Sequence, residues 1–347
     1  MIIGRSIPGR PRLRWGGVVR VAGLAAALLA PHAPARAAAE PDRVTVQLKW
    51  HHQTQFAGVY VADAKGFYRA ERLAVEYRPW RVGDPSPVAQ VLSGRAAFGI
   101  TSHTEFLVAL EKGAPVVAIA AIYQKSPVGF FVLKGSGIKH PRDFAGKTIA
   151  FAPTHEIHLK AVLKRVGLDL RSLRPVPYRF DLTPFYKGEV AIWAGYVMNQ
   201  PVDARLAGYE TTVIFPDDYG VHTYDDIVFT SRELLAGSPA LAERWLRATL
   251  RGWRYAVEHP EEATEIALRV DPQLKREKQL AMLLASIPLI HTGDHPIGWM
   301  TREVWAEAAE ILLDQGLLAQ RPDLARAYTT ALLERIHGGG HAAGPAR

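Results

Sequence analysis

The junction between the first predicted strand and the first predicted helix holds the side chains best suited to ligand binding. It reads LKWHHQTQFAGVYVA from residue 48, with Trp50 closing the strand. Phe56 and Tyr60 are four residues apart and share one helix face. Gln53 and a second glutamine two residues later supply neutral donors and acceptors. Ligands of open α/β sheets bind beyond the carboxyl ends of strands, so aromatic rings beside amides predict a site for a planar heterocycle. The alternative is that Phe56 and Tyr60 are ordinary core residues.

Two histidines three residues apart, His155 and His158, form a second candidate pattern. On a helix start they could ligate a metal, although a solvated helix N-terminus explains them equally simply and is our expectation. The chain has no cysteine, which excludes disulfides, thiolate metal sites and haem attachment. It also lacks the G-x-S-x-G, GxxxxGK[ST] and H-E-x-x-H motifs. The sequence therefore favours binding over catalysis, with no metal and no cofactor.

The formal net charge of +8 is concentrated at the N-terminus. Residues 1–39 hold six arginines and no acidic residue, which leaves +2 for the remainder. The remaining basic residues are dispersed, so no nucleic-acid partner is expected.

The same N-terminal segment has the layout of a cleavable export signal. A basic leader precedes the apolar run VAGLAAALLA, and alanine-rich cleavage choices follow, after Ala37 or Ala39. The apolar run is shorter than the about 20 residues that span a membrane, although an uncleaved anchor is the alternative. We expect a periplasmic, soluble protein of roughly 310 residues, exported by the general secretion route.

The predicted elements alternate, which is the pattern of an α/β protein. Short β-rich runs and helical stretches follow one another from Val44, and a second series starts at TIAFA after residue 147. This alternation predicts parallel sheets covered by helices. From Pro239 onward the spacing is helical only. The length exceeds one ordinary core, so we expect two lobes with the last helices packed on lobe one.

Four stretches of the chain resemble the thiamine-pyrimidine-synthase-like family of periplasmic binding proteins. They are LKWHHQTQFAGVYVADAKGFYRAERLAVEY, the segment 94–151, AIWAGYVMNQP and DYGVHTYDDIVFTSRELL. The resemblance extends from about Val44 to Ile336. It implies the type II periplasmic-binding-protein fold, with two α/β lobes joined by two crossovers. It divides the chain into an export signal (1–39), lobe one (40–132), lobe two (133–227), the return to lobe one with the C-terminal helices (228–336) and a disordered tail (337–347).

The resemblance also implies a function and a site. Such proteins carry a small molecule to the permease and ATPase subunits of an ABC importer, and we expect a monomer that binds a thiamine pyrimidine precursor or a related compound. Riboflavin or an alkylsulfonate is the alternative ligand. By similarity, the ligand-binding residues are Trp50, Gln53, Phe56, Tyr60, Thr101, Ser102 and Gln124 from lobe one and Trp193, Tyr196, Asn199 and Gln200 from lobe two. Ser102 could equally be an ordinary helix N-cap. The hinge is expected near residues 130–134 and 225–230.

The family also contains an enzyme, which makes the thiamine pyrimidine from its own histidine and pyridoxal phosphate. Aligned on Gly58, Phe56 occupies the position of the donor histidine, and residues 191–194 read AIWA in place of a cysteine-rich iron segment. These departures disfavour the synthase alternative. Relatives often carry Glu at the position of Gln200. If that amide faces the cleft, it favours a neutral or carbonyl-rich ring, whereas an exposed loop residue would have no such role.

Overall fold

The computed structural model describes residues 40–338. The predicted export signal, residues 1–39, and residues 339–347 of the expected tail lie outside the described residues. None of the described helices is long and apolar enough to cross a membrane.

Lobe one is built on a five-stranded mixed sheet with the order β2-β1-β3-β10-β4. Its strands are β1 (Asp42–Gln47), β2 (Leu73–Arg78), β3 (Phe98–Thr101), β4 (Val116–Tyr123) and β10 (Asp225–Ser231). Strand β10 runs antiparallel between β3 and β4, so the parallel sheet expected from sequence is wrong at this strand. Because of this direction, the first residues of β10 lie at the same edge as the carboxyl ends of β3 and β4, with Asp225 opposite Tyr123.

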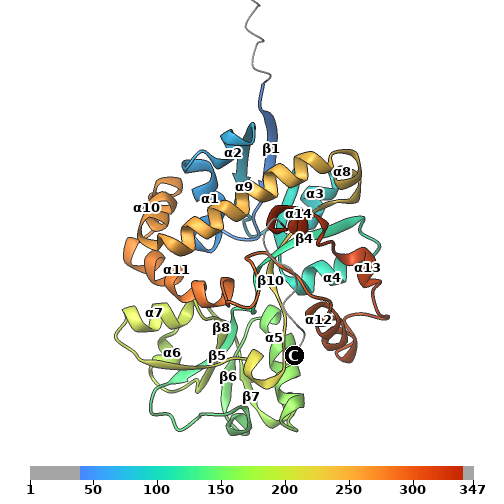
Figure 1. Cartoon of the computed structure of the whole chain (residues 1–347). Helices are drawn as coiled ribbons and strands as arrows, with labels where there is room; N and C mark the ends of the chain where they lie inside the picture. Colours follow the sequence, from blue (N-terminus) through green and yellow to red (C-terminus); the bar gives the residue numbers. More distant parts are fainter. Residues whose placement is uncertain (1–39, 339–347) are drawn as a thin grey trace, which may run out of the picture. The chain divides into compact units, whose positions relative to one another are not determined.

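Lobe two is built on a second mixed sheet with the order β7-β6-β8-β5-β9. Its strands are β5 (Val128–Leu133), β6 (Thr148–Ala150), β7 (Arg174–Val176), β8 (Ile192–Tyr196) and β9 (Thr211–Ile214). Strand β6 is parallel to β7 and β8, and β5 is antiparallel to both of its neighbours. Figure 1 shows the two sheets with their helices.

The two crossovers lie elsewhere than predicted. The chain leaves the first sheet after Tyr123 and enters the second at Val128, and it returns between Ile214 and Asp225. The predicted boundaries after residues 132 and 227 therefore lie inside β5 and β10, and the predicted hinge segments overlap these two strands. The strand-like run from residue 116 to 133 is broken only by the short turn around Pro127, which the sequence pattern did not separate from its strands.

Helices cover both sheets. Lobe one carries η1 (Thr54–Phe56), α1 (Ala57–Ala64), α2 (Phe67–Ala70), α3 (Pro87–Leu92) and α4 (His103–Glu111). Lobe two carries η2 (Pro141–Phe144), α5 (Pro153–Arg165), η3 (Leu170–Ser172), α6 (Thr183–Tyr186), α7 (Gln200–Leu206) and, after β9, η4 (Asp217–Tyr219). The last helices are α8 (Arg232–Gly237), α9 (Pro239–Glu258), α10 (Pro260–Val270), α11 (Arg276–Ile290), α12 (Arg302–Asp314), α13 (Leu324–Ala327) and α14 (Ala331–His337).

The long helix α9 packs directly on α1, the helix that follows the predicted ligand-binding junction (Figure 1). Gly58 and Gly252 allow this approach, because a Cβ at Gly252 would lie 2.1 Å from the carbonyl oxygen of Gly58. On the sheet side, Trp245 of α9 stacks on Phe98 with ring centroids 3.9 Å apart. The C-terminal helices thus pack on lobe one, but α12 also contacts α5 and α11 also contacts α7 of lobe two.

Candidate functional site

The two sheets meet at a buried group of polar residues, which we call the Lys49 cluster: Lys49, Gln55, Tyr196, Asp225 and Asp226. Lys49 follows β1, Tyr196 ends β8 and Asp225 begins β10. The Lys49 ammonium forms an ion pair with Asp225 and lies 3.3 Å from the Tyr196 hydroxyl. Tyr196 in turn donates a hydrogen bond to Asp225 Oδ2 over 2.6 Å. The cluster therefore joins the carboxyl edge of the lobe-two sheet to that of the lobe-one sheet.

Asp226 is the most unusual member of the cluster. Its Oδ1 lies 2.7 Å from Lys49 Nζ and accepts a hydrogen bond of 2.8 Å from Gln55 Nε2. Its Oδ2 is buried and has no hydrogen-bond partner among the described residues. Its backbone adopts φ +46°, a left-handed conformation that side chains other than glycine rarely take. Strain and an unpartnered buried oxygen at one residue are typical of functional sites.

The charges of the cluster follow from burial and pairing. Burial raises the pKa of Asp226 to about 6, with Lys49 opposing the shift and Asp225 adding to it. Burial would also raise the pKa of Asp225, but the charge of Lys49 and hydrogen bonds from Lys49 and Tyr196 outweigh it and hold this pKa below its usual value. Burial opposes the charge of Lys49, yet the two carboxylates raise its pKa well above normal. At neutral pH the cluster thus carries one positive and two negative charges.

Three buried histidines, His103, His155 and His158, are close enough to Asp225 for its charge to act on them. Burial lowers the pKa of His103 to about 3 and the pKa values of His155 and His158 to about 4, so all three are neutral at pH 7. His158 Nε2 lies 3.0 Å from the Thr223 hydroxyl. Nε2 of His103 and Nδ1 of both His155 and His158 have no partner among the described residues. The expected solvated start of α5 is therefore wrong, because both of its histidines face the interior. The described residues contain no group of three metal-ligating side chains.

The aromatic and amide residues predicted for the lobe-one side of the site lie in two different environments. Trp50 is half-buried and stacks on Trp80, with ring centroids 5.8 Å apart and planes at 21°. Gln53 donates to Gln55 Oε1 over 2.6 Å and so touches the Lys49 cluster. Phe56 and Tyr60 are at most 1% exposed and belong to the hydrophobic core, which is the alternative stated for them above.

The other predicted residues of lobe one are engaged with the protein itself. Thr101 donates to Glu105 over 2.5 Å. Ser102 caps α4 by accepting the amide hydrogen bond of Glu105, as the N-cap alternative proposed. Gln124 donates to the carbonyl oxygens of Ala121 and Trp299.

In lobe two, the side chain of Gln200 holds the end of β8, where Tyr196 lies. Its Oε1 accepts from the backbone N–H of Tyr196 over 3.1 Å, and its Nε2 donates to the Tyr178 hydroxyl over 3.2 Å. Trp193, two residues before Gly195, is buried with its ring 5.5 Å from that of Tyr178. Asn199 directly precedes α7 and makes no side-chain cap. Both ends of the Gln200 amide are thus used within lobe two.

The sequence prediction missed the charged centre of the site. Lys49 stands beside Trp50 in the quoted junction, and the pair Asp225-Asp226 stands in the quoted return segment. Two adjacent acids directly before the apolar run IVF do not by themselves indicate this burial, because charged residues are almost never fully buried unless they are paired.

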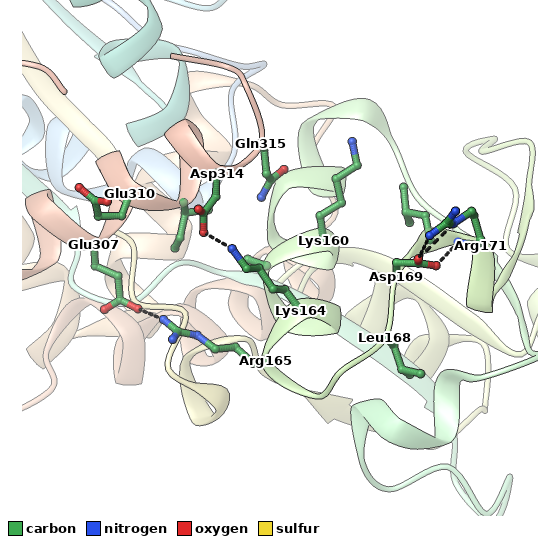
Figure 2. A pocket seen from close by; sticks show the side chains of 13 residues that line it. Lys160, Lys164, Arg165, Leu168, Asp169, Arg171, Glu307, Glu310, Asp314 and Gln315 are labelled. Atoms are coloured by element: carbon green, nitrogen blue, oxygen red, sulfur yellow. Dashed lines mark hydrogen bonds and ion pairs between the residues drawn. The ribbon is translucent and has the colours of Figure 1, made fainter. Parts of the chain in front are cut away.

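A second hollow lies between α5 and α12, apart from the Lys49 cluster. Figure 2 shows this cavity of about 940 Å³ and the charged side chains around it. Lys164 pairs with Asp314 over 2.7 Å, and Arg165 pairs with Glu307 over 3.1 Å. These two ion pairs connect lobe two to α12.

The chain is similar to proteins that are named as binding proteins and to proteins that are named as enzymes. A family model described as "NMT1/THI5 like" matches residues 53–263. The riboflavin-binding protein RibY of Chloroflexus aurantiacus is 28% identical over 90% of this chain and 92% of its own. A 4-amino-5-hydroxymethyl-2-methylpyrimidine phosphate synthase of Legionella pneumophila is 28% identical over 71% and 79%. The formylaminopyrimidine-binding protein of Halalkalibacterium halodurans is 25% identical over 80% and 88%.

Solved structures confirm the predicted fold. The alkanesulfonate-binding protein SsuA of Xanthomonas axonopodis pv. citri superposes with a TM-score of 0.63 at 18% identity, covering 84% of this chain and 99% of that protein. A putative periplasmic sulfonate-binding protein of Methylobacillus flagellatus gives 0.67 at 15% identity, covering 86% and 95%. The desulfurization enzyme DSZB gives 0.62 at 14% identity, covering 86% and 99%. The fold therefore serves binding proteins and at least one enzyme.

Proposed function

Because the chain belongs to the NMT1/THI5-like family, we propose that it is a periplasmic solute-binding protein that carries a small planar heterocycle to an ABC importer. The observation that supports this most strongly is the Lys49 cluster. There the carboxyl edges of both sheets meet, and there buried polar atoms of Asp226, His155 and His158 have no partner among the described residues. Ligands of α/β sheets bind at such edges, and a buried polar atom without a partner costs about 1–3 kcal/mol.

The proposed site has two kinds of contact. Trp50 would supply aromatic surface from lobe one, and the Lys49 cluster would supply charged and polar groups, whereas Trp193 is 2% exposed and packs in the core of lobe two. We propose that Gln200 and Asn199 position Tyr196 through their bonds to its backbone. The other predicted residues, Phe56, Tyr60, Thr101, Ser102 and Gln124, are engaged in the core or with Glu105, Ala121 and Trp299.

The remaining parts of the proposal concern export, closure of the two lobes and delivery of the ligand. Cleavage of the export signal in residues 1–39 would release the protein as a monomer. Lobe one and lobe two would then close on the ligand by motion at the crossovers, residues 124–127 and 215–224. The permease and ATPase subunits of the importer would be its partners.

The identity of the ligand is the most specific part of the proposal. One relative is named for binding riboflavin and another for binding formylaminopyrimidine, and both are flat nitrogen heterocycles. A ring of this class would stack on Trp50 and place its polar edge against the Lys49 cluster.

The proposal is tested by purifying the chain and measuring its melting temperature with riboflavin, aminopyrimidines, nucleobases, alkylsulfonates and nitrate. A ligand that binds only the folded state stabilises it by RT ln(1 + [L]/Kd), about 2.7 kcal/mol at a hundredfold excess over Kd. We expect a saturable rise with a flat heterocycle, confirmed by calorimetry. The absence of any rise would contradict the proposal.

The synthase alternative rests on the 28% identity to the Legionella enzyme. It predicts formation of 4-amino-5-hydroxymethyl-2-methylpyrimidine phosphate when the chain is incubated with pyridoxal phosphate and iron. The sequence contains no cysteine for a thiolate iron site and has Phe56 at the position of the donor histidine. We therefore expect no product by mass spectrometry, and detection of stoichiometric product would replace the binding proposal.

A further inference from the structure

The Lys49 cluster has a surplus of negative charge. The side chains of Lys49, Asp225 and Asp226 are only 11%, 5% and 1% exposed, so water screens them little. Lys49 is already paired with both carboxylates. The nearby histidines are neutral, since burial lowers their pKa values. One negative charge of the cluster is therefore left without a cation among the residues that the structure describes.

The surplus negative charge of the cluster is available to a ligand at Asp226. Its Oδ1 receives contacts from Lys49 and Gln55, whereas Oδ2 is buried and unpartnered. Its backbone is left-handed, with φ +46°, a conformation that is strained in a residue other than glycine. A strained carboxylate with an unpartnered oxygen lowers the stability of the unbound protein. A ligand that donates a hydrogen bond to Oδ2 would complete the bonds of Asp226.

The described residues of lobe two bring no cation to the cluster. The groups it brings to the cluster are the hydroxyl of Tyr196 and the neutral rings of His155 and His158, whose Nδ1 atoms are also buried and unpartnered. The amide of Gln200 is used by Tyr196 and Tyr178. An anionic ligand would face two carboxylates with one cation already shared between them, which is unfavourable in a buried site.

We infer, on the basis of the proposed function, that the site selects ligands whose ring edge carries N–H donors or a positive charge, with Asp226 as the acceptor, and rejects sulfonates. This differs from the preference for a neutral, carbonyl-rich ring that Gln200 suggested from sequence. The difference arises because Gln200 is occupied within its own lobe, so the charge of the site is set by Asp225 and Asp226.

The test is calorimetry at pH 7.5 with three probes: 4-amino-5-hydroxymethyl-2-methylpyrimidine, riboflavin and hexanesulfonate. The first two carry N–H donors, and the third is an anion without one. We expect at least one ring to bind 100-fold or more tightly than hexanesulfonate. Asp226→Asn should weaken the binding of that ring at least tenfold. It should also reduce the ratio between the affinity for the ring and the affinity for hexanesulfonate. Glu258→Gln, which removes an equal charge from the exposed end of α9, is the matched control and should change neither affinity.

The outcomes separate the inference from the proposed function. Tighter binding of hexanesulfonate than of both rings, or an unchanged preference in Asp226→Asn, would overturn the inference while leaving a small-molecule binding protein. Binding of none of the three probes, with no thermal shift in the wider screen, would overturn the proposed function and the inference together.

A measurement on the unaltered protein decides the matter if circular dichroism shows that Asp226→Asn does not fold. A donor that binds Asp226 stabilises its ionised form, so binding of the preferred ring should release a proton near pH 6, and riboflavin itself does not ionise there. The groups facing this region are Lys49, Asp225, Gln55, Tyr123, Tyr196, His103, His155 and His158. Calorimetry in two buffers of different ionisation enthalpy counts the proton. Uptake of a proton by the riboflavin complex would overturn the inference.

Discussion

The hydroxyl of Tyr196 donates a hydrogen bond to Oδ2 of Asp225 over 2.6 Å, and the two residues belong to different sheets. Tyr196 ends β8 of lobe two, whereas Asp225 begins β10 of lobe one directly after the second crossover. Lys49 pairs with the other oxygen of the same carboxylate. One buried carboxylate thus connects the strand ends of both lobes, and its bonds are made only while the lobes are together.

Replacing Tyr196 by Phe should therefore weaken the closed arrangement. A hydrogen bond to a charged group contributes about 1.5–3 kcal/mol, so we expect ligand affinity to fall by roughly tenfold or more. The unbound protein should become more open, with a larger radius of gyration in small-angle X-ray scattering. Tyr209→Phe removes a hydroxyl from a partly exposed tyrosine of lobe two and should leave both measurements unchanged. Equal behaviour of the two variants would contradict a role for the Tyr196 hydroxyl in closure.

Acidification should destabilise the protein through its buried histidines. The pKa values of His103, His155 and His158 are lowered to about 3, 4 and 4, so the unfolded chain binds more protons than the native one between about pH 6.5 and 4. Asp226 acts oppositely, because its pKa is raised to about 6 and its native form binds the extra proton. Near pH 5 the net difference is about two protons, which lowers the free energy of unfolding by roughly 2–3 kcal/mol per pH unit of acidification.

This pH dependence is measured by urea unfolding between pH 7 and 5. His158→Gln should reduce the slope by close to one proton, whereas His259→Gln, at an exposed histidine after α9, should not. A free energy of unfolding that rises on acidification would show that the histidines are not buried in their neutral form.

The fold was largely accessible from the sequence, and the charged centre of the site was not. Alternating apolar runs gave the two α/β lobes, since hydrophobic periodicity is a local property. The directions of β5 and β10 were missed because strand direction is set by the crossovers, which bring segments about a hundred residues apart into one sheet.

The burial of Asp225 and Asp226 was missed for the same physical reason. Two adjacent acids normally indicate a solvated turn, and only Lys49, 176 residues earlier in the chain, makes their burial possible. Likewise, the pairing of Gln200 with Tyr178 depends on how α7 packs beside β8. Trp50 stays a prediction from one local feature, its place just after the first strand, although β1 ends at Gln47 and not at Trp50 as expected.

Trp50 should contribute stacking energy to a flat ligand. Its ring lies against Trp80 and is only half-buried, so part of it remains available. Replacing it by Ala should weaken binding of the preferred ring by about 1–3 kcal/mol, as for bases stacked on aromatic side chains. Trp50→Phe keeps an aromatic face and should recover part of the loss. Unchanged affinity of Trp50→Ala in calorimetry would remove this residue from the proposed site.

The contact between α12 and lobe two should depend on apolar packing more than on its ion pairs. Ile311 lies on α12, yet it is 7% exposed and belongs to the hydrophobic cluster of lobe two. Truncating a buried isoleucine to Ala costs about 2–5 kcal/mol. Lys164 and Asp314, which pair across the same contact in Figure 2, are 69% and 54% exposed. Exposed pairs of this kind contribute about 0.2–1 kcal/mol.

We therefore expect Ile311→Ala to lower the free energy of unfolding by about 2–5 kcal/mol and Lys164→Met by less than about 1 kcal/mol, measured by urea denaturation in low salt. Sodium chloride at high concentration should remove the effect of Lys164→Met, because salt screens exposed charges, and should leave the effect of Ile311→Ala. Since α12 packs on α5, which carries His155 and His158, ligand affinity should follow the same order. A larger loss of unfolding free energy from Lys164→Met than from Ile311→Ala would contradict this. It would show that the ion pairs between α5 and α12, and not the packing of Ile311, hold the two lobes together.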